Sequence, residues 1–220
     1  MGCSSLSAVV GFPEWWPTGD RIAVVIAHGE GDLNDPLVSS LHTELARQRF
    51  LTLRFNFPFA EAGKKSKNVD PAILDKAFRA ALGLIFQDKT SAPSHLFLGG
   101  VGLGAQAAAR LAITRIQSNG LFFLGFPLHA KGAPEQPNVE ALYRVTSSML
   151  FLQGSADPRC ELDVLRRSLS RVGAPTVLRI FEGADGLLRQ AGQSEAERQG
   201  TYLAASRIVG EWMDGILDDA

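Results

Sequence analysis

The stretch HLFLGGVGLGAQAAARLA, residues 95–112, decides the fold of this chain. Its apolar run Leu96–Leu98 is typical of a β-strand, and the run stops at a cluster of glycines. An alanine-rich segment with strong helix propensity follows. A strand, a tight glycine turn and a helix in this order form part of a βαβ unit. Such a tight turn is typical of a site that holds a ligand or a functional group at its apex.

The rest of the chain alternates between strand and helix patterns. Apolar and β-branched runs predict six strands, at residues 21–27, 50–55, 95–99, 120–126, 148–154 and 176–183. Helical spacing predicts helices at residues 36–48, 70–87, 104–117, 157–173 and 196–217. This alternation predicts an α/β fold with a mainly parallel sheet and helices on both faces. We expect a single domain over residues 1–220, in which residues 1–20 are an N-terminal extension or add a seventh, edge strand.

Composition excludes several classes of protein. The chain has 220 residues and a formal net charge of −1, without the basic face that nucleic-acid binding requires. Two cysteines, Cys3 and Cys160, do not make a disulfide framework. No apolar run is long enough to span a bilayer, and the first residues lack the pattern of a signal peptide. We therefore expect a cytoplasmic protein that binds neither nucleic acid nor membranes.

The glycine turn fits two functional motifs. The first is the dinucleotide-binding turn, because Gly100, Gly102 and Ala105 match G-x-G-x-x-A. That motif usually opens the first βαβ unit, whereas two strand–helix units precede this one. It also requires an acidic residue at the end of the next strand, and the next strand, ending LFFLGFPLH, carries none. The dinucleotide interpretation is therefore the weaker one.

The second motif is the nucleophile elbow, G-x-S-x-G, a cramped turn between a strand and a helix. Small residues flank Gly102, which stands where the serine would be. The first strand ends in AHGEGD, residues 27–32, at the usual place of an oxyanion-hole loop. Asp157, in GSADP, follows the strand two after the elbow, which is the position of the catalytic acid. The loop after the last strand should carry a histidine but contains Asp185 and Gly186.

With these motifs the chain resembles a compact, dienelactone-hydrolase-like branch of the α/β-hydrolases, which includes a testis-expressed protein and a histone-acetyltransferase-complex subunit. The most distinctive stretches are RFNFPFAEAGKK (54–65) and GFPLHAKGAPE (125–135), and the resemblance covers most of residues 21–188. It implies a minimal hydrolase fold without a large lid, and hydrolysis of ester bonds. The family pattern has serine at Gly102, histidine at Gly186, usually a basic residue at Val101 and a small residue at Glu30.

These departures affect the chemistry directly. Serine hydrolysis needs a nucleophile, a base and an orienting acid, and only Asp157 keeps its expected position. Gly102 supplies no oxygen and Gly186 supplies no imidazole. Backbone N–H donors of an oxyanion hole do not depend on side chains, although the Glu30 carboxylate would oppose a developing anion. The candidate pocket and oxyanion residues are His28, Gly29, Glu30, Arg54, Asn56, Val101, Leu103 and His129.

Each polar candidate also has a structural interpretation. We expect Cys160 to be a buried cysteine on the helix that begins at Asp157, and Asp157 to cap that helix. His28 is expected to brace its loop, and His129 is the best remaining polar candidate for chemistry, although contact with loop backbone is its commoner role. Arg54 and Asn56 either line a polar pocket or satisfy loop carbonyls. His42 and His95 are expected on a helix surface and at a strand start.

The leading hypothesis is a pseudo-hydrolase that has lost its nucleophile and its histidine, and that binds a small molecule or a protein partner. The alternative is an active hydrolase with a non-standard site, and the third hypothesis is a dinucleotide-binding protein. No cofactor and no metal are expected.

Overall fold

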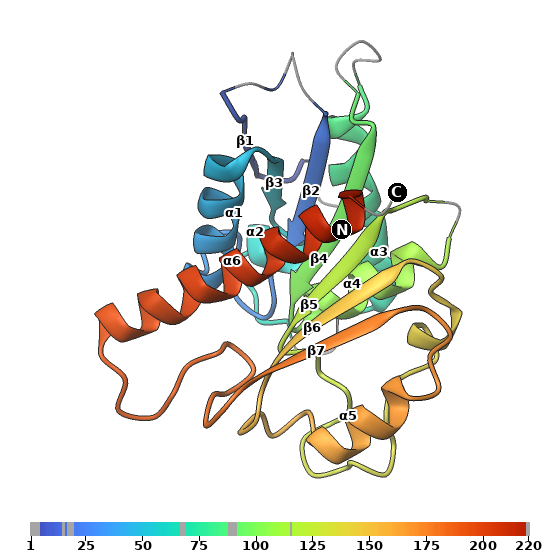
Figure 1. Cartoon of the computed structure of the whole chain (residues 1–220), viewed down its shortest axis with the longest axis vertical. Coiled ribbons are helices and arrows are strands. Elements are labelled where there is room, and N and C mark those ends of the chain that lie inside the picture. Colours follow the sequence, from blue (N-terminus) through green and yellow to red (C-terminus); the bar gives the residue numbers. More distant parts are fainter. Residues whose placement is uncertain are drawn as a thin grey trace.

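A computed structural model describes residues 5–14, 16, 20–66, 69–87, 92–114 and 116–218. Among them, seven strands form one sheet: β1 (Ala8–Gly11), β2 (Ile22–Ala27), β3 (Leu51–Phe55), β4 (His95–Val101), β5 (Gly120–Leu124), β6 (Ser148–Gly154) and β7 (Thr176–Phe181). The strand order is β1-β3-β2-β4-β5-β6-β7 (Figure 1). Neighbouring strands are parallel except β1, which pairs antiparallel with β3 from Ala8 opposite Phe55. The predicted α/β fold is confirmed, including the seventh strand at the edge.

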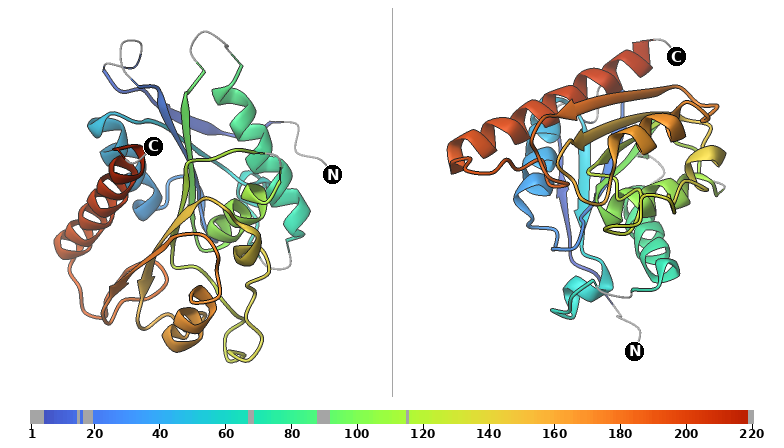
Figure 2. Two further views of the ribbon diagram at one scale, coloured as in Figure 1. Left: turned by 45° about the vertical axis from the view of Figure 1, so that its right-hand side comes forward. Right: turned by 90° about the horizontal axis from the view of Figure 1, so that it is seen from below.

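The helices are α1 (Pro36–Gln48), α2 (Pro58–Glu61), α3 (Pro71–Ile85), α4 (Leu103–Ala112), α5 (Leu162–Leu169) and α6 (Glu195–Asp218), with one 3₁₀ turn, η1 (Leu142–Arg144). Helices α1 and α6 cover one face of the sheet, and α3, α4 and α5 cover the other (Figure 2). Two helices start at an Asp-Pro pair: Asp35 accepts hydrogen bonds from the amides of Leu37 and Val38 at the start of α1, and Asp70 accepts one at the start of α3. Proline fits the first helical position because that residue needs no N–H.

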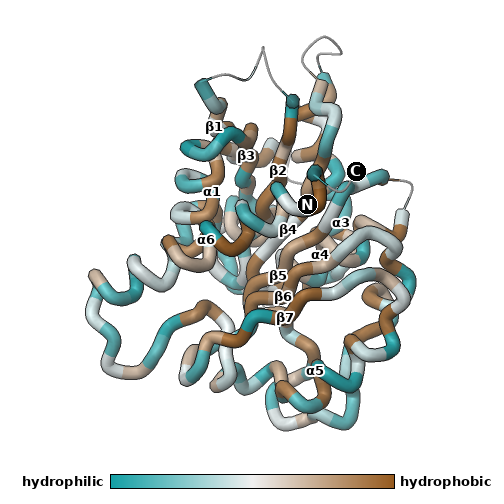
Figure 3. Tube along the Cα trace, in the orientation of Figure 1, coloured by the Kyte–Doolittle hydropathy of each residue, from teal (hydrophilic) through white to brown (hydrophobic). Residues whose placement is uncertain are grey.

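The core consists of two apolar layers, one on each face of the sheet. Every residue of β2 is buried, and the central strands form the most apolar part of the chain trace (Figure 3). One layer packs under α3, α4 and α5 and contains Phe55, Phe78 and Phe123. The other packs under α1 and α6 and contains Phe50 and Phe97. Burial of both faces explains why these strands are continuous apolar runs rather than alternating ones.

Helices α4 and α5 are several residues shorter than the sequence predicts. Helix α4 ends at Ala112 rather than at 117, because both the amide and the hydroxyl of Thr114 bond to the Leu111 carbonyl and close the last turn. Helix α5 spans only Leu162–Leu169 rather than 157–173, so the prediction that Asp157 caps a helix is wrong. The short helix α2 was not predicted from sequence.

Candidate functional site

A pocket of about 220 Å³ lies at the carboxyl edge of the sheet. Four loops line it: those after β2, β4, β6 and β7. The three positions expected to form a triad, Gly102, Asp157 and Gly186, all line this one pocket. The fold therefore brings together residues that lie far apart in the sequence, at the edge where parallel sheets bind ligands.

Gly102 forms a sharp turn between β4 and α4. Its backbone has φ 53° and ψ −117°, and its amide donates to the Leu124 carbonyl at 3.0 Å. A residue with a side chain is strained at such a positive φ, by about 1–3 kcal/mol. Space itself is available, because an added Cβ would lie 3.7 Å from Gly29 Cα and 3.9 Å from Arg159 Nη2. The space in which a side chain at position 102 would stand is thus open toward the Arg159 guanidinium.

Asp157 lies in the turn between β6 and α5 and is 5% exposed. Its Oδ1 accepts from the Arg159 amide at 2.9 Å, and its Oδ2 accepts from Gln153 Nε2 at 2.9 Å. A Cβ added to Gly186 would stand 2.6 Å from that Oδ2. The carboxylate and the α-carbon of Gly186 are therefore neighbours, so close that a side chain at position 186 would require one of the two to shift.

Asp185 organises the loop that carries Gly186. Its carboxylate accepts from the amides of Leu187 and Arg189 and forms an ion pair with the Arg189 guanidinium at 2.7 Å. Burial acts to raise the pKa of Asp185, but the hydrogen bonds from Arg189 and Leu187 and the charge of Arg189 together hold that pKa below its usual value. Leu188, fully buried, has a positive φ of 58° in the same loop. The loop is thus held by hydrogen bonds and an ion pair to its own carboxylate.

His28 and His129 each connect two segments of backbone. His28 Nδ1 donates to the Gly29 carbonyl and its Nε2 accepts from the Phe57 amide, both at 2.9 Å. Burial lowers the pKa of His28 to about 4, so the ring is neutral at neutral pH. His129 Nδ1 likewise donates to the Ala130 carbonyl, and its Nε2 accepts from the Glu161 amide at 2.9 Å. Because both ring nitrogens of each histidine are engaged, neither ring is placed to take a proton from a substrate.

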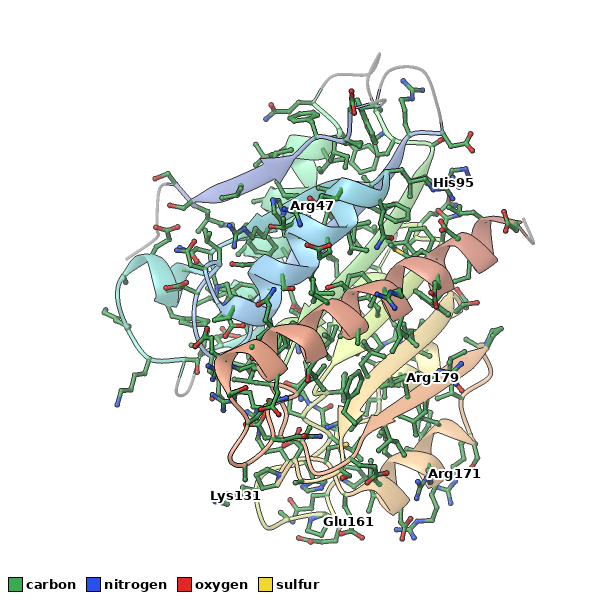
Figure 4. All side chains as sticks on the ribbon, turned by 60° about the vertical axis from the view of Figure 1, so that its left-hand side comes forward. Arg47, His95, Lys131, Glu161, Arg171 and Arg179 are labelled. Atoms are coloured by element: carbon green, nitrogen blue, oxygen red, sulfur yellow. The ribbon has the colours of Figure 1, made fainter. Side chains whose placement is uncertain are left out.

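His28 and His129 do not line this pocket, and neither do the other two histidines, His42 and His95. The prediction that His42 lies on a helix surface is wrong: it is 6% exposed. Its Nε2 faces Gly11, because the edge strand β1 packs beside α1. His95 begins β4, as expected, at the end of the molecule opposite to Lys131 and Glu161 (Figure 4).

Cys160 is buried and is not part of a helix, because it precedes α5. Its amide donates to the Asp157 carbonyl in the turn. Burial, followed by the charge of Asp157, raises the pKa of the Cys160 thiol to about 12. A thiol with so high a pKa carries almost no thiolate at neutral pH and is a poor nucleophile. Cys3 lies outside the described residues.

The remaining candidates support the loop after β2. Arg54 donates to the Leu33 carbonyl at 2.7 Å and to the Ser39 hydroxyl, and Asn56 Oδ1 accepts from the Leu33 amide at 2.7 Å. Of the two interpretations of Arg54 and Asn56, the structure favours satisfaction of loop backbone. Val101 is fully buried at the end of β4, and Leu103 begins α4.

Sequence reasoning named Glu30 and Asp157 but missed three other charged residues that line the pocket, Asp35, Arg159 and Arg189. Arg159 Nη1 lies 2.5 Å from Glu30 Oε1 and joins the loop after β6 to the loop after β2. Arg189 and Asp35 also line the pocket. Their place in loops at the carboxyl edge was the available signal. Among the lining residues that the structure describes, none carries a hydroxyl, a thiol or an imidazole.

A larger hollow, about 1180 Å³, lies at the opposite, amino ends of β4 and β5. Its polar side chains already serve the fold: Asn119 bonds to the Leu96 amide and to His95, and the Ser147 hydroxyl donates to the Ser118 carbonyl.

In the described part of the chain no three His, Cys, Asp or Glu residues gather as metal ligands. No helix within the described ranges is long and apolar enough to cross a membrane.

Comparison with known proteins agrees with this architecture. Residues 20–214 match the model of a family described as alpha/beta hydrolase domain. A dienelactone hydrolase from Anabaena variabilis has 18% identity and a TM-score of 0.74 over 96% of this chain and 91% of its own. An alpha-beta serine hydrolase homologue from Coxiella burnetii has 16% identity and a TM-score of 0.71, over 94% and 90%. A serine hydrolase without lid from Xanthomonas campestris has 17% identity and a TM-score of 0.65, over 92% and 88%.

Proposed function

The chain belongs to the alpha/beta hydrolase domain family, and from that premise we propose that it is a non-catalytic member, which binds a small molecule or a protein partner at the pocket over Gly102. The proposal rests on one observation: Gly102 and Gly186, which have no side chains, line the same pocket as Asp157. A cytoplasmic location is part of the same proposal.

The magnitude of the loss supports the proposal. In a serine protease, removal of the serine or the histidine alone lowers kcat by about 10⁶, which corresponds to roughly 8 kcal/mol of transition-state stabilisation. The described lining offers no hydroxyl, thiol or imidazole side chain as a substitute. Outside the lining, Cys160 has a raised pKa, and both nitrogens of His28 and of His129 are hydrogen-bonded to backbone. A backbone oxyanion hole without a nucleophile and a base provides only weak catalysis.

An active hydrolase with a non-standard site is the second candidate. It is favoured by the similar fold of proteins named dienelactone hydrolase and serine hydrolase. Below 25% identity that similarity concerns the fold and not the reaction. The dinucleotide-binding hypothesis has less support, because β5 ends at Leu124 and is followed by Gly125 and Phe126 without a carboxylate.

The test is reaction with a fluorophosphonate probe, together with turnover of p-nitrophenyl esters and thioesters. We expect no labelling, and no ester hydrolysis beyond the weak catalysis of a backbone oxyanion hole, because no side-chain oxygen or sulfur stands at the elbow. Asp157→Asn and His129→Gln serve as matched variants. Stoichiometric labelling of a defined residue, or turnover that either variant abolishes, would favour the active hydrolase instead.

A further inference from the structure

Arg159 is held so that its side chain points over the elbow. Its amide donates to Asp157 Oδ1 at 2.9 Å, and its carbonyl accepts from the His129 amide at 3.0 Å. The backbone is thereby fixed on both sides of the residue. The guanidinium Nη2 lies 3.9 Å from the point where a Cβ on Gly102 would stand. The cation therefore occupies the approach to the vacated nucleophile position.

The partner of this guanidinium is easily exchanged. Among the described residues, Glu30 is the only one that pairs with the Arg159 side chain. The Glu30 side chain is 59% exposed, whereas that of Arg159 is 28% exposed. A carboxylate that is mostly in water loses little when an ion pair opens, and exposed ion pairs contribute little to stability. Glu30 can thus return to water while Arg159 stays in place.

The other carboxylates that line the pocket already have hydrogen-bond partners close to them in the sequence. Asp185 pairs with Arg189, and Asp157 accepts from Gln153 and the Arg159 amide. Asp35 accepts from two amides at the start of α1. The Arg159 guanidinium, in contrast, is paired with Glu30 of another loop, and this mostly exposed carboxylate can move away into water.

The floor of the pocket leaves room for a ligand beside Arg159. Gly29, Gly31, Gly102 and Gly186 contribute backbone and no side chains to a volume of about 220 Å³. That volume admits a small organic anion rather than a polymer. A planar guanidinium recognises the paired oxygens of a carboxylate or a phosphate by two parallel hydrogen bonds.

We propose that the pocket over Gly102 binds a small anion, a carboxylate or a phosphate ester, through Arg159, and that Glu30 occupies the place of that anion in the free protein. The inference rests on the proposed function, because it assigns a ligand class to the same pocket. An anion can bind Arg159 only in those molecules in which Glu30 has left the guanidinium. The apparent affinity of the natural chain for the anion is therefore its intrinsic affinity multiplied by the fraction of molecules in which the Glu30–Arg159 pair is open.

The test is an NMR titration of backbone amides with sodium benzoate and with inorganic phosphate at constant ionic strength, and with benzyl alcohol as the neutral probe. Glu30→Gln is expected to bind at least one of the two anions about three- to sixfold more tightly than the natural chain, with the largest shifts at Gly29, Gly102 and Leu103. Arg159→Gln is expected to lose binding. The two anions distinguish a carboxylate ligand from a phosphate ligand, and benzyl alcohol should bind to neither protein.

Asp163→Asn is the matched control. It removes the same charge from another exposed ion pair, Asp163–Arg166 on α5, at 3.0 Å. Its affinity should equal that of the natural chain. If Arg159→Gln does not fold, Arg159→Lys keeps the charge but not the planar fork, and is expected to weaken binding at least fivefold.

Equal affinities for Glu30→Gln and Asp163→Asn, no anion binding by any variant, or full binding by either Arg159 variant would overturn the inference. Failure of the proposed function would be seen separately, as labelling by the fluorophosphonate probe.

Discussion

Gly104→Ala is expected to lower the free energy of unfolding by about 3 kcal/mol, at the upper end of the usual cost of overpacking. Gly104 is the second residue of α4, and an added Cβ would stand 2.6 Å from the His28 carbonyl oxygen and closer still to that of Ala27. Both atoms belong to backbone, so neither can turn aside. The helix would have to move away from the end of β2, which also carries the loop with Glu30. Urea denaturation of the variant and the natural chain measures the difference.

The matched control is Gly83→Ala, a substitution within α3. Nothing lies within 4 Å of an added Cβ at Gly83. Alanine should therefore stabilise that helix by about 0.5–1 kcal/mol, the usual gain over glycine in a helix interior. A Gly104→Ala protein as stable as the natural chain would mean that the strand end and α4 do not approach as closely as the structure has them.

Acidification from pH 7 to pH 4.5 is expected to lower the free energy of unfolding by about 2 kcal/mol for each of His28 and His42. Burial lowers the pKa of His28 from 6.5 to about 4. Burial, followed by the charge of Arg54, lowers the pKa of His42 to about 4 as well. In the unfolded chain the two histidines therefore bind protons below about pH 6.5, whereas in the folded chain they stay neutral down to about pH 4. Stability is full above pH 6.5 and is lost as the pH falls through this window.

The structural cause is clearest at His28, whose Nε2 must stay unprotonated to accept from the Phe57 amide. Urea denaturation at several pH values tests the expectation. His28→Gln and His42→Gln should each remove about half of the pH dependence. Asp35, whose pKa burial raises, contributes in the opposite direction, so the variants identify the cause better than the total does. An unchanged profile in both variants would contradict the assignment.

Local patterns predicted most of the scaffold. The apolar runs that became β2 through β6 are buried on both faces, whereas β7 is only half-buried, and such runs are visible without any knowledge of their neighbours. An Asp-Pro pair marked the start of α3, and the structure shows the same pair at the start of α1, because a capping carboxylate followed by proline acts within one turn. The same pair at Asp157 misled the prediction: there the carboxylate accepts from the Arg159 amide in a turn, and α5 begins five residues later, at Leu162. A local signal cannot tell a helix cap from a turn when both satisfy the same carboxylate.

The sequence by itself determined that positions 102 and 186 carry no nucleophilic or basic side-chain atom, because glycine has none in any fold. It also determined the strand–turn–helix that carries Gly102. Only the tertiary structure decided that Glu30 meets Arg159 across the pocket, that the edge strand covers His42, and that alanine fits at Gly83 but not at Gly104. Each of these depends on atoms brought together from distant parts of the chain, and such contacts leave no trace in the periodicity of either segment.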